Sequence, residues 1–442
     1  MNRIAIEIVR GLGGLALLVF MACGGNAAGD GAVSAAPTSE STESAVERFA
    51  DGVAWLAADA REGRGLGTDG LAEAGEWIAE RFAEIGLEPA GSDGFLHPFP
   101  ASIPDPTNPH AEGRPVEAFN VVGRLPAGGP APLDGTIVVG AHYDHLGFGG
   151  AGSLAPDVRA VHNGADDNAS GTMALIEVAR GLAERRGELR RDVVFVAFSA
   201  EERGLVGSST FVHAPPAGLA IDEVVAMLNM DMVGRLGEER LQVLGGESAE
   251  EWDEIVTPAC ASHGLECLLS GDGFGASDHS SFFAADIPVL HFFTGAHPQY
   301  HRPEDDAPLV DVEGAVRIVQ LIESVTETLA AREAALTLVR SSDAPARQML
   351  TGGARLGTIP DYAGPPDGRP GLLLSAVRAD SPAERGGLQR GDLIVGIDDR
   401  EIRGIEDFMA VLSEATPGER ASVKIMRNDE PMQLEVVYGD RP

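Results

Sequence analysis

Histidines and carboxylates recur along the middle of the chain in groups that could hold metal ions. Imidazole nitrogens and carboxylate oxygens together suit zinc, which accepts both kinds of donor. Two imidazoles and three carboxylates exceed the needs of one tetrahedral ion, but they fit two neighbouring ions if one carboxylate bridges them. Such a pair lowers the pKa of its water from about 15.7 towards about 7 and polarises a carbonyl group, which is hydrolytic chemistry. The five candidate ligands are His142, His301, Asp231 and one acid from each of the pairs Asp166-Asp167 and Glu201-Glu202, with Asp144 close to His142 in the sequence.

The elements that must position these residues are strands alternating with helices. Such alternation predicts an α/β fold with a mostly parallel mixed sheet flanked by helices. Ligands bind beyond the carboxyl ends of the strands in such sheets, so the candidates are expected to meet at one edge. Strands are expected at residues 120–125, 136–141, 192–198, 224–229, 241–244 and 288–293, and helices at 46–58, 70–85, 171–184, 204–212, 250–262 and 312–334. The proline-rich passage 98–115 is expected to be a surface loop.

Each candidate also has a structural interpretation when it is taken alone. The acidic pair Asp166-Asp167 directly precedes a helix, where carboxylates cap free N–H groups and are favoured by the helix dipole. Glu201-Glu202 could likewise favour the start of the following helix, and His142 could be a hydrogen-bonded structural histidine. Their joint occurrence at successive strand ends favours the metal site.

The motifs around these residues resemble those of the secreted bacterial di-zinc aminopeptidases, relatives of glutamate carboxypeptidase and glutaminyl cyclase. The resemblance covers roughly residues 46–335. It rests on GAHYD (140–144), GADDNASG (164–171), FSAEERGLVGS (198–208), NMDMVG (229–234), SDH (277–279) and YHRPED (300–305). One small departure is that Ser199-Ala200 stands where the family often has glycine before the paired glutamates.

The resemblance implies two Zn²⁺ ions and a separate role for each candidate. His142 and Asp231 would hold one ion, Glu202 and His301 the other, and Asp167 would bridge them. Glu201 would be the general base that takes a proton from water and returns it to the leaving amine. Asp144 and Asp278 would support the ligands from behind, with Asp144 orienting His142. Asp166 is expected only to cap the helix, and His279, His291 and His297 are not expected to be ligands.

The implied reaction is hydrolysis of a peptide bond that releases an N-terminal residue from a peptide substrate. Exopeptidase preference is less secure than hydrolysis, because it depends on an acidic group that recognises the free amine. Alternatives within the same architecture are carboxypeptidase activity and glutaminyl cyclisation. A non-catalytic binding protein of the cell envelope is the alternative from another functional class, although the complete ligand set with Glu201 argues against it.

The net charge of the chain and its N-terminal residues indicate which class of partner and which cellular location to expect. The chain has 68 Asp and Glu against 33 Lys and Arg, a net charge of -35, which excludes nucleic acid as a likely class of partner. Arg3, Arg10 and the short apolar stretch 11–22 are typical of an export signal. Residues 20–23 (FMAC) resemble a lipobox, so Cys23 is expected to carry a lipid, with ordinary cleavage near Ala27 or Ala28 as the alternative. The protein is expected in the cell envelope or secreted.

The cysteines are compatible with a location outside the cytoplasm, but the sequence does not decide whether they form a disulfide. Besides Cys23 the chain has only Cys260 and Cys267, which could form a disulfide outside the cytoplasm or remain two partly buried thiols. Neither lies in a C-x-x-C motif typical of a metal site. No segment after the export signal is long and apolar enough to cross a membrane, so a lipid at Cys23 is the only membrane attachment expected.

The C-terminal part of the chain resembles a bacterial PDZ domain, a small β-rich fold. The motifs are GLLLSAV (371–377), SPAERGGL (381–388) and GDLIVGI (391–397), followed by a helix-like segment at 405–413. PDZ domains bind a peptide or protein C-terminus as an added strand, here expected between Leu372, Leu373 and Leu374 and that helix. A packing module without a ligand is the alternative. The expected organisation is a signal peptide (1–23), a flexible tether (24–45), a di-zinc peptidase domain (46–337), a linker (338–351) and a PDZ domain (352–440).

Overall fold

The computed structural model describes the chain from residue 39 onwards, with gaps. The described residues are 39–103, 113–150, 152–155, 158–237, 240–340, 354–360, 365, 369–378, 381–404, 407–408, 411–412 and 415–439. The predicted signal peptide with Cys23, most of the tether, and residues 341–351 of the predicted linker lie outside them. Within the described residues, no helix has the length and apolar character needed to span a bilayer.

The first unit of the fold is built on a nine-stranded mixed sheet in the order β1-β3-β5-β4-β6-β9-β7-β8, with β2 paired to β3. The central strands β5, β4, β6 and β9 run parallel to their neighbours within this group. Their side chains are almost all buried, as expected for strands covered on both faces. The strands are β1 (Glu88–Pro89), β2 (Leu96–Ile103), β3 (Arg114–Leu125), β4 (Thr136–His142), β5 (Asp192–Phe198), β6 (Val224–Met230), β7 (Leu241–Leu244), β8 (Cys267–Ser270) and β9 (Val289–Phe293).

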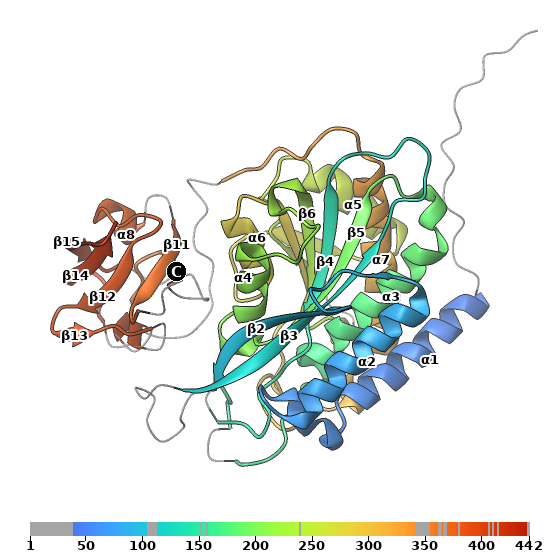
Figure 1. Cartoon of the computed structure of the whole chain (residues 1–442), viewed down its shortest axis with the longest axis horizontal. Helices are drawn as coiled ribbons and strands as arrows, with labels where there is room; N and C mark the ends of the chain where they lie inside the picture. Colours follow the sequence, from blue (N-terminus) through green and yellow to red (C-terminus); the bar gives the residue numbers. More distant parts are fainter. Residues whose placement is uncertain are drawn as a thin grey trace, which may run out of the picture. The chain divides into compact units, whose positions relative to one another are not determined.

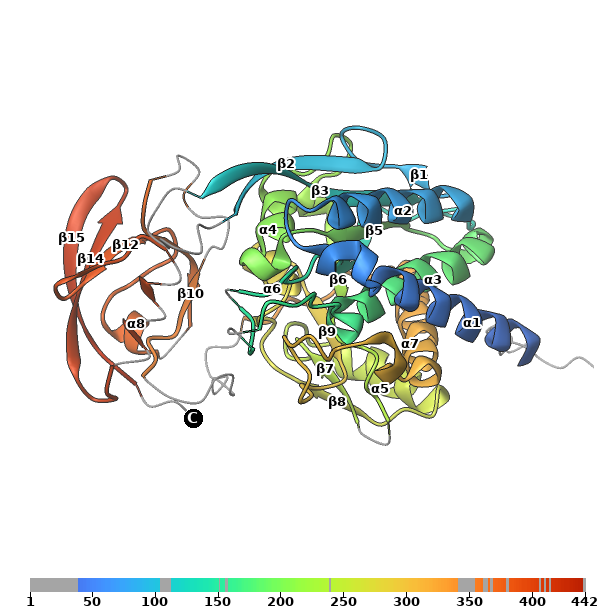
Figure 2. The same cartoon turned by 90° about the horizontal axis from the view of Figure 1, so that it is seen from below.

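Helices cover both faces of this sheet, as Figures 1 and 2 show. Alternate strand residues point to opposite faces: Ile137 and Phe195 belong to the core that includes α1, α2, α3, α5 and α7, whereas Val138 and Val194 pack with α4 and α6. The sequence prediction of an α/β fold is therefore confirmed. The helices are α1 (Ser39–Leu56), α2 (Asp69–Ile85), α3 (Gly171–Glu184), α4 (Val206–His213), α5 (Trp252–Ser262), α6 (His279–Ala284) and α7 (Val312–Ala331).

The structure differs from the expected elements in two places, at residues 98–115 and at the start of the first helix. The expectation of a surface loop at 98–115 is wrong, because β2 pairs with β3 along its whole length and only residues 104–112 lie outside the description. β2 is an edge strand whose partner is β3, and an edge strand tolerates Pro98 and Pro100 because its outer N–H groups need no partner. Helix α1 begins at Ser39, within the segment expected to be tether.

The second unit is a six-stranded antiparallel sheet with a hydrophobic core of its own. Its order is β10-β11-β12-β14-β15, with β13 paired to β12. The helix expected at 405–413 is described at residues 407–408 and 411–412, which are helical. The elements are β10 (Thr358–Pro360), β11 (Leu372–Val377), α8 (Pro382–Arg385), β12 (Leu393–Ile397), β13 (Arg400–Glu401), β14 (Arg420–Arg427) and β15 (Glu430–Val437).

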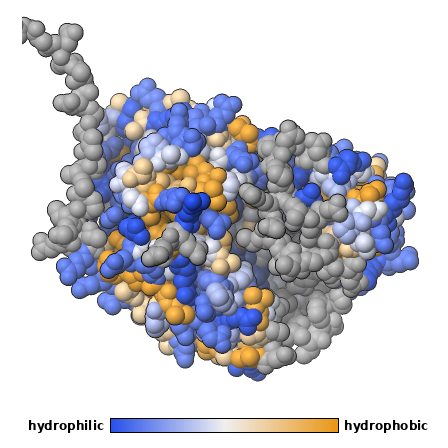
Figure 3. Space-filling view, turned by 180° about the vertical axis from the view of Figure 1, so that it is seen from behind, coloured by the Kyte–Doolittle hydropathy of each residue, from blue (hydrophilic) through white to orange (hydrophobic). Residues whose placement is uncertain are grey.

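The surface reflects the acidic composition of the chain. Figure 3 shows hydrophilic residues over much of one face, with hydrophobic residues gathered in patches between them. Large side chains that are exposed despite being apolar include Phe148, Leu154 and Val158, which follow β4 on the loop towards the candidate site.

Candidate metal centre

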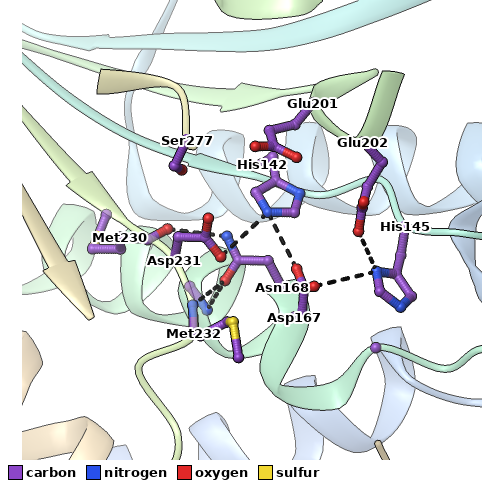
Figure 4. Close-up of polar contacts among 12 residues, drawn as sticks. His142, His145, Asp167, Asn168, Glu201, Glu202, Met230, Asp231, Met232 and Ser277 are labelled. Atoms are coloured by element: carbon purple, nitrogen blue, oxygen red, sulfur yellow. Dashed lines mark hydrogen bonds and ion pairs between the residues drawn. The ribbon is translucent and has the colours of Figure 1, made fainter. Parts of the chain in front are cut away.

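The candidate ligands meet at the carboxyl edge of the parallel strands. His142 is the last residue of β4, Asp231 directly follows β6, and His301 lies in the loop after β9. Glu201 and Glu202 form a short helical turn just beyond β5, and Asp167 lies in the turn that leads into α3. Figure 4 shows His142, Asp167, Asp231 and the two glutamates turned towards one another.

Asp167 stands between two imidazole rings, one at each carboxylate oxygen. Its Oδ1 lies 3.4 Å from Nε2 of His142, and its Oδ2 lies 3.2 Å from Nε2 of His301. The two oxygens of one carboxylate therefore address two different groups of side chains. This is the arrangement that a bridging ligand requires.

Each group is completed by one further carboxylate. Oδ1 of Asp231 lies 3.4 Å from Nε2 of His142, and Oε2 of Glu202 lies 3.3 Å from Nε2 of His301. Oδ1 of Asp231 is buried and has no hydrogen-bond partner among the described residues. A buried carboxylate oxygen without a donor is costly unless a cation neutralises it.

These spacings fit zinc. Ligand atoms about 2.0–2.1 Å from a tetrahedral ion stand about 3.3–3.4 Å from one another, from the geometry of a tetrahedron. The four distances from His142 and His301 to the carboxylate oxygens span 3.2–3.4 Å. Nitrogen and carboxylate oxygen are also the donor types that zinc accepts. The residues present therefore fit an ion in each group.

The pKa of His301 shows how strongly Glu202 and Asp167 favour a positive charge between them. Burial opposes the charged imidazole, but Glu202 and Asp167 outweigh it and raise the pKa of His301 to about 11. Burial and the charge of Asp167 oppose ionisation of Glu202, yet His301 and His145 outweigh both and lower the pKa of Glu202 to about 2. A cation between these side chains would take the place of the histidine proton.

Glu201 lies near His142 and Asp231, but farther from His142 than Asp167 and Asp231 do. An oxygen of Glu201 and ligand atoms of His142 and Asp231 all lie within 4.8 Å of one another. Burial raises the pKa of Glu201 well above its ordinary value, and the nearby carboxylates Glu202 and Asp278 raise it further against His142. A carboxylate with a raised pKa beside a metal site is suited to accept a proton.

Asp144 supports both sides of this arrangement. Its backbone carbonyl lies 3.2 Å from Nδ1 of His142, while its carboxylate lies 3.8 Å from the same atom. The carboxylate accepts hydrogen bonds from the backbone N–H groups of Glu201 (3.0 Å) and Glu202 (3.4 Å). Asp144 therefore positions the glutamate turn as well as His142, a role that was not expected from the sequence.

Asp278 is buried next to these residues, immediately before α6. Burial raises the pKa of Asp278 to about 7, His142 counteracts this, and Asp144 and Asp231 add to the increase. These influences place Asp278 among the charges of the site. It belongs to neither group of potential metal ligands found in the described part of the chain.

The expectation that Asp166 caps α3 is wrong. Its Oδ1 accepts hydrogen bonds from the backbone N–H of Gly234 (2.6 Å) and the hydroxyl of Ser170 (3.0 Å), which ties the turn to the loop after β6. Asn168 satisfies the helix start instead, because its Oδ1 accepts from the N–H of Gly171 at 2.9 Å. An amide oxygen three residues before the N–H has the usual spacing of such a cap.

Three further histidines lie in the same region. His297 approaches the Oδ2 of Asp166 at 3.3 Å, and the rings of His279 and His291 stack with centroids 4.5 Å apart. The two groups of potential metal ligands among the described residues are His142 with Glu201 and Asp231, and His145 with Asp167 and Glu202. Neither group includes these three histidines or His301, although Nε2 of His301 lies 3.2 Å from Asp167 and 3.3 Å from Glu202.

Arg64, His145 and Asp305 support the site but were not assigned from the sequence. The buried Arg64 donates to the carbonyls of Tyr143 and Gly164, one beside each of the segments that carry His142 and Asp167. Asp305 accepts from the N–H of Asp167 at 3.1 Å. His145 was detectable only as a second histidine in the string HYDH, which does not reveal its partner.

Tyr300 is another residue without a role predicted from the sequence. Its ring stacks on His301, with centroids 3.8 Å apart. Burial raises the pKa of the phenol, and the carboxylates Asp167, Glu202 and Glu201 raise it further. Tyr300 therefore keeps its proton and remains a hydrogen-bond donor beside the site.

The residues of the predicted PDZ groove lie on strand β11. Leu372 and Leu374 are buried in the core of their sheet, whereas Leu373 is partly exposed. The N–H and C=O of Leu374 pair with Asp392 and Gly391 on the β12 side. On its other side β11 pairs with β10, whose partners on β11 are Leu374, Ala376 and Val377, so β11 is an inner strand of this sheet from Leu374 onwards.

Comparisons with known families agree with both sequence resemblances. Residues 120–326 match the model of peptidase family M28, and residues 353–437 match the model of the PDZ domain. Aminopeptidase YwaD of Bacillus subtilis is 35% identical over 188 residues, which cover 40% of this chain and 37% of that protein. A protein of Arthroderma otae named "Probable leucine aminopeptidase" is 29% identical over 216 residues, 46% of this chain and 56% of that protein. The matched segment thus spans about half of these relatives or less.

Solved structures show the same fold. BSAP, a zinc aminopeptidase from Bacillus subtilis, superimposes with a TM-score of 0.51 at 19% identity, covering 66% of this chain and 96% of that chain. Porphyromonas gingivalis glutaminyl cyclase gives a TM-score of 0.51 at 18% identity, covering 66% of this chain and 98% of that chain. At this level of identity the similarity establishes only the architecture of the first unit. The reaction has to be inferred from the residues of the site.

Proposed function

We propose that this chain is a zinc-dependent aminopeptidase that releases N-terminal residues from peptides. The match of residues 120–326 to peptidase family M28 supports this proposal. One observation carries this proposal. Asp167 directs its two oxygens at 3.4 and 3.2 Å to His142 and His301, and Asp231 and Glu202 complete the two groups. The relatives named as aminopeptidases support the same reaction.

In the proposed centre, His142 and Asp231 would hold one zinc ion, Glu202 and His301 would hold a second, and Asp167 would serve both. Bound there, zinc would lower the pKa of a water molecule and polarise the carbonyl of the scissile peptide. Glu201 takes the proton of the attacking water and delivers it to the leaving amine, so the peptide C–N bond breaks as a C–O bond forms. Asp144 keeps Glu201 in place through the N–H of that residue.

Hydrolysis of aminoacyl-anilides, measured together with bound zinc, tests the enzyme. Glu201→Gln is expected to reduce turnover by about 10²- to 10⁴-fold, the range for loss of a general base, while the zinc content stays unchanged. Glu250→Gln, at an exposed glutamate outside the site, is the matched control and should keep full activity. A wild-type protein that holds no zinc and stays inactive after zinc addition would refute the proposal.

Glutaminyl cyclisation is the second candidate, because the cyclase of Porphyromonas gingivalis shares the fold. It would appear as pyroglutamate formation from peptides that begin with glutamine. A panel of free and blocked peptides separates aminopeptidase, carboxypeptidase and cyclase action in a single experiment. Release of residues from blocked N-termini would argue against the aminopeptidase.

For the second unit we propose that the PDZ domain binds the C-terminus of a peptide or protein in a groove between Leu372, Leu373 and Leu374 and the helical segment that includes residues 407–408 and 411–412. Fluorescent C-terminal peptides and their amidated forms provide the assay, because the domain class recognises the terminal carboxylate. Equal binding of both forms would exclude this mode. Capture of peptides without any hydrolysis by the full chain would favour the non-catalytic binding protein.

We also propose that the protein is exported and anchored through a lipid on Cys23. The disulfide between Cys260 and Cys267 supports a location outside the cytoplasm, where such bonds persist. Cell fractionation of the wild type and of Cys23→Ser tests the anchor, since the variant should leave the membrane fraction. Mass spectrometry of the mature N-terminus distinguishes lipidation from ordinary cleavage.

A further inference from the structure

His145 is a buried histidine beside the proposed second ion that has no part in the mechanism above. It is 1% exposed, and its Nδ1 lies 2.7 Å from Oε1 of Glu202. The same nitrogen is 3.9 Å from Oδ2 of Asp167. His145, Asp167 and Glu202 therefore also have the spacing of a group that could hold a metal ion, with ligand atoms within 4.8 Å of one another. Its other ring nitrogen, Nε2, is buried and has no partner among the described residues.

The contact with Glu202 has the length of a hydrogen bond and is shorter than the spacing of two ligands on one ion. Ligand atoms around zinc stand about 3.3–3.4 Å apart, as the contacts of His142 and His301 do. At 2.7 Å, a nitrogen facing a carboxylate oxygen donates a proton to it in a charge-assisted hydrogen bond. An Nδ1 that carries this proton cannot also bind a metal.

The two oxygens of Glu202 are thereby divided between two tasks. Oε1 accepts the proton from His145, and Oε2 faces Nε2 of His301 at 3.3 Å. A carboxylate held at one oxygen cannot rotate away from the position that suits an ion at the other. Without the hydrogen bond, Oε1 would be a buried acceptor lacking its donor, and the carboxylate would be free to turn.

The ring of His145 is itself held in place by a close pairing of two chain segments. The N–H of His145 donates to the carbonyl of Arg64 at 3.0 Å, and the N–H of Gly147 donates to the carbonyl of Gly63 at 3.0 Å. A Cβ at Gly65 would lie 2.7 Å from the Cα of Gly147, so the two backbones approach as only glycine allows.

A glycine on the other side completes the enclosure of the ring. A Cβ added to Gly164 would lie 2.5 Å from Cδ2 of His145, and Gly164 has a φ of 54°. Its carbonyl accepts from the guanidinium of Arg64 at 2.8 Å. The imidazole therefore lies between the segment of Arg64 and the segment that leads to Asp167, with its Nδ1 directed at Glu202 in Figure 4.

We propose that His145 is a positioning residue that holds Glu202 ready for the second ion and selectively strengthens that ion's binding. The proposal rests on the two-ion centre proposed above. Residues behind metal ligands typically change affinity by 10- to 100-fold when they are lost, because the ligand must then be ordered on binding. The ion between His142 and Asp231 should bind as in the wild type.

Two variants of similar size separate a hydrogen-bond donor from a metal ligand and from a packing residue. In His145→Asn the amide nitrogen takes the place of Nδ1 and can still donate to Glu202, whereas His145→Leu fills a similar volume without a donor. Zinc affinity is measured on the metal-free full chain by competition with a chromophoric chelator, and melting of the metal-free proteins shows that each variant is folded. His145→Ala replaces the leucine variant if the latter does not fold.

The expected result is that His145→Leu binds the second zinc ion, the one near Glu202 and His301, 10- to 100-fold more weakly than the wild type. In His145→Asn the affinity for this ion should be largely restored. Equal loss in both variants would mean that the imidazole is a ligand, and no loss in either would mean that it only packs. Both results overturn the proposal. If the wild type binds one ion only, the two-ion centre is wrong, and an unchanged affinity for that ion in His145→Leu refutes the role of His145 as well.

Discussion

Replacing Arg64 with methionine should destabilise the first unit strongly. The Arg64 guanidinium is fully buried, and its hydrogen bonds within the described part of the chain all go to backbone carbonyls. It donates instead to the backbone carbonyls of Leu56 (2.8 Å), Tyr143 (2.8 Å), Asn163 (2.7 Å) and Gly164 (2.8 Å). Burial lowers the pKa of Arg64 to about 10, so the side chain is still charged at neutral pH, and Asp167 and Asp144 favour that charge.

The magnitude follows from the carbonyls that would lose their donor. Gly164 would keep a second hydrogen bond, from the N–H of Ala169 at 3.2 Å, so three buried carbonyls are at risk. Each costs about 1–3 kcal/mol when left without a partner. Relief of the cost of burying the guanidinium offsets part of this sum, which leaves a loss of about 4 kcal/mol, as is usual when one side of a buried charged contact is removed.

Thermal unfolding of the metal-free protein measures this loss. About 4 kcal/mol corresponds to a decrease of roughly 10 °C in the melting temperature of a domain of this size. Arg64→Lys keeps the charge and some donors and should lose about half as much. Arg240→Met removes a largely exposed arginine that pairs with Glu266 and should change the melting temperature by less than about 2 °C. A melting temperature for Arg64→Met as close to the wild type as this control would refute the role given to Arg64.

Three further predictions concern the bridge, a buried acid and the disulfide. Asp167→Asn should lower the zinc content from two ions per chain to one or fewer, because an amide has a single oxygen for two ions; metal analysis that still finds two ions would exclude the bridge. Burial raises the pKa of Glu323 to about 7 despite its contact with Arg185, so the folded state holds this proton more tightly than the unfolded one, and the wild type should lose stability as pH rises from about 4.5 through 7. Melting curves at several pH values should show a flatter decline for Glu323→Gln, and parallel declines would contradict this. Reduction of the Cys260–Cys267 disulfide, which closes a short loop across a sequence separation of 7, should cost about 2.5 kcal/mol, and melting with and without reductant measures it.

The sequence by itself determined the edge of the sheet at which the site would form. Runs of β-branched residues marked the central strands, and His142, Glu202, Asp231 and His301 each follow one of them. Parallel strands bring such positions together whatever the details of packing, so local patterns were sufficient. They did not reveal the β2–β3 hairpin, because its prolines are tolerated only at an edge strand, and edge position is a property of the whole sheet.

Tertiary structure alone decided which atoms face one another. The family resemblance assigned the bridging role to Asp167, but only the structure shows that its two oxygens face His142 and His301 and that Asp166 accepts from the N–H of Gly234. Arg64 and His145 lie 81 residues apart in the chain. Their support of the site depends on a close approach of two backbones that glycines allow, and such an approach leaves no periodic signal in the sequence. The residues that could bind a metal can be predicted from their types and from their positions at strand ends. The hydrogen bonds that hold these residues in place cannot, because they depend on contacts between segments distant in sequence.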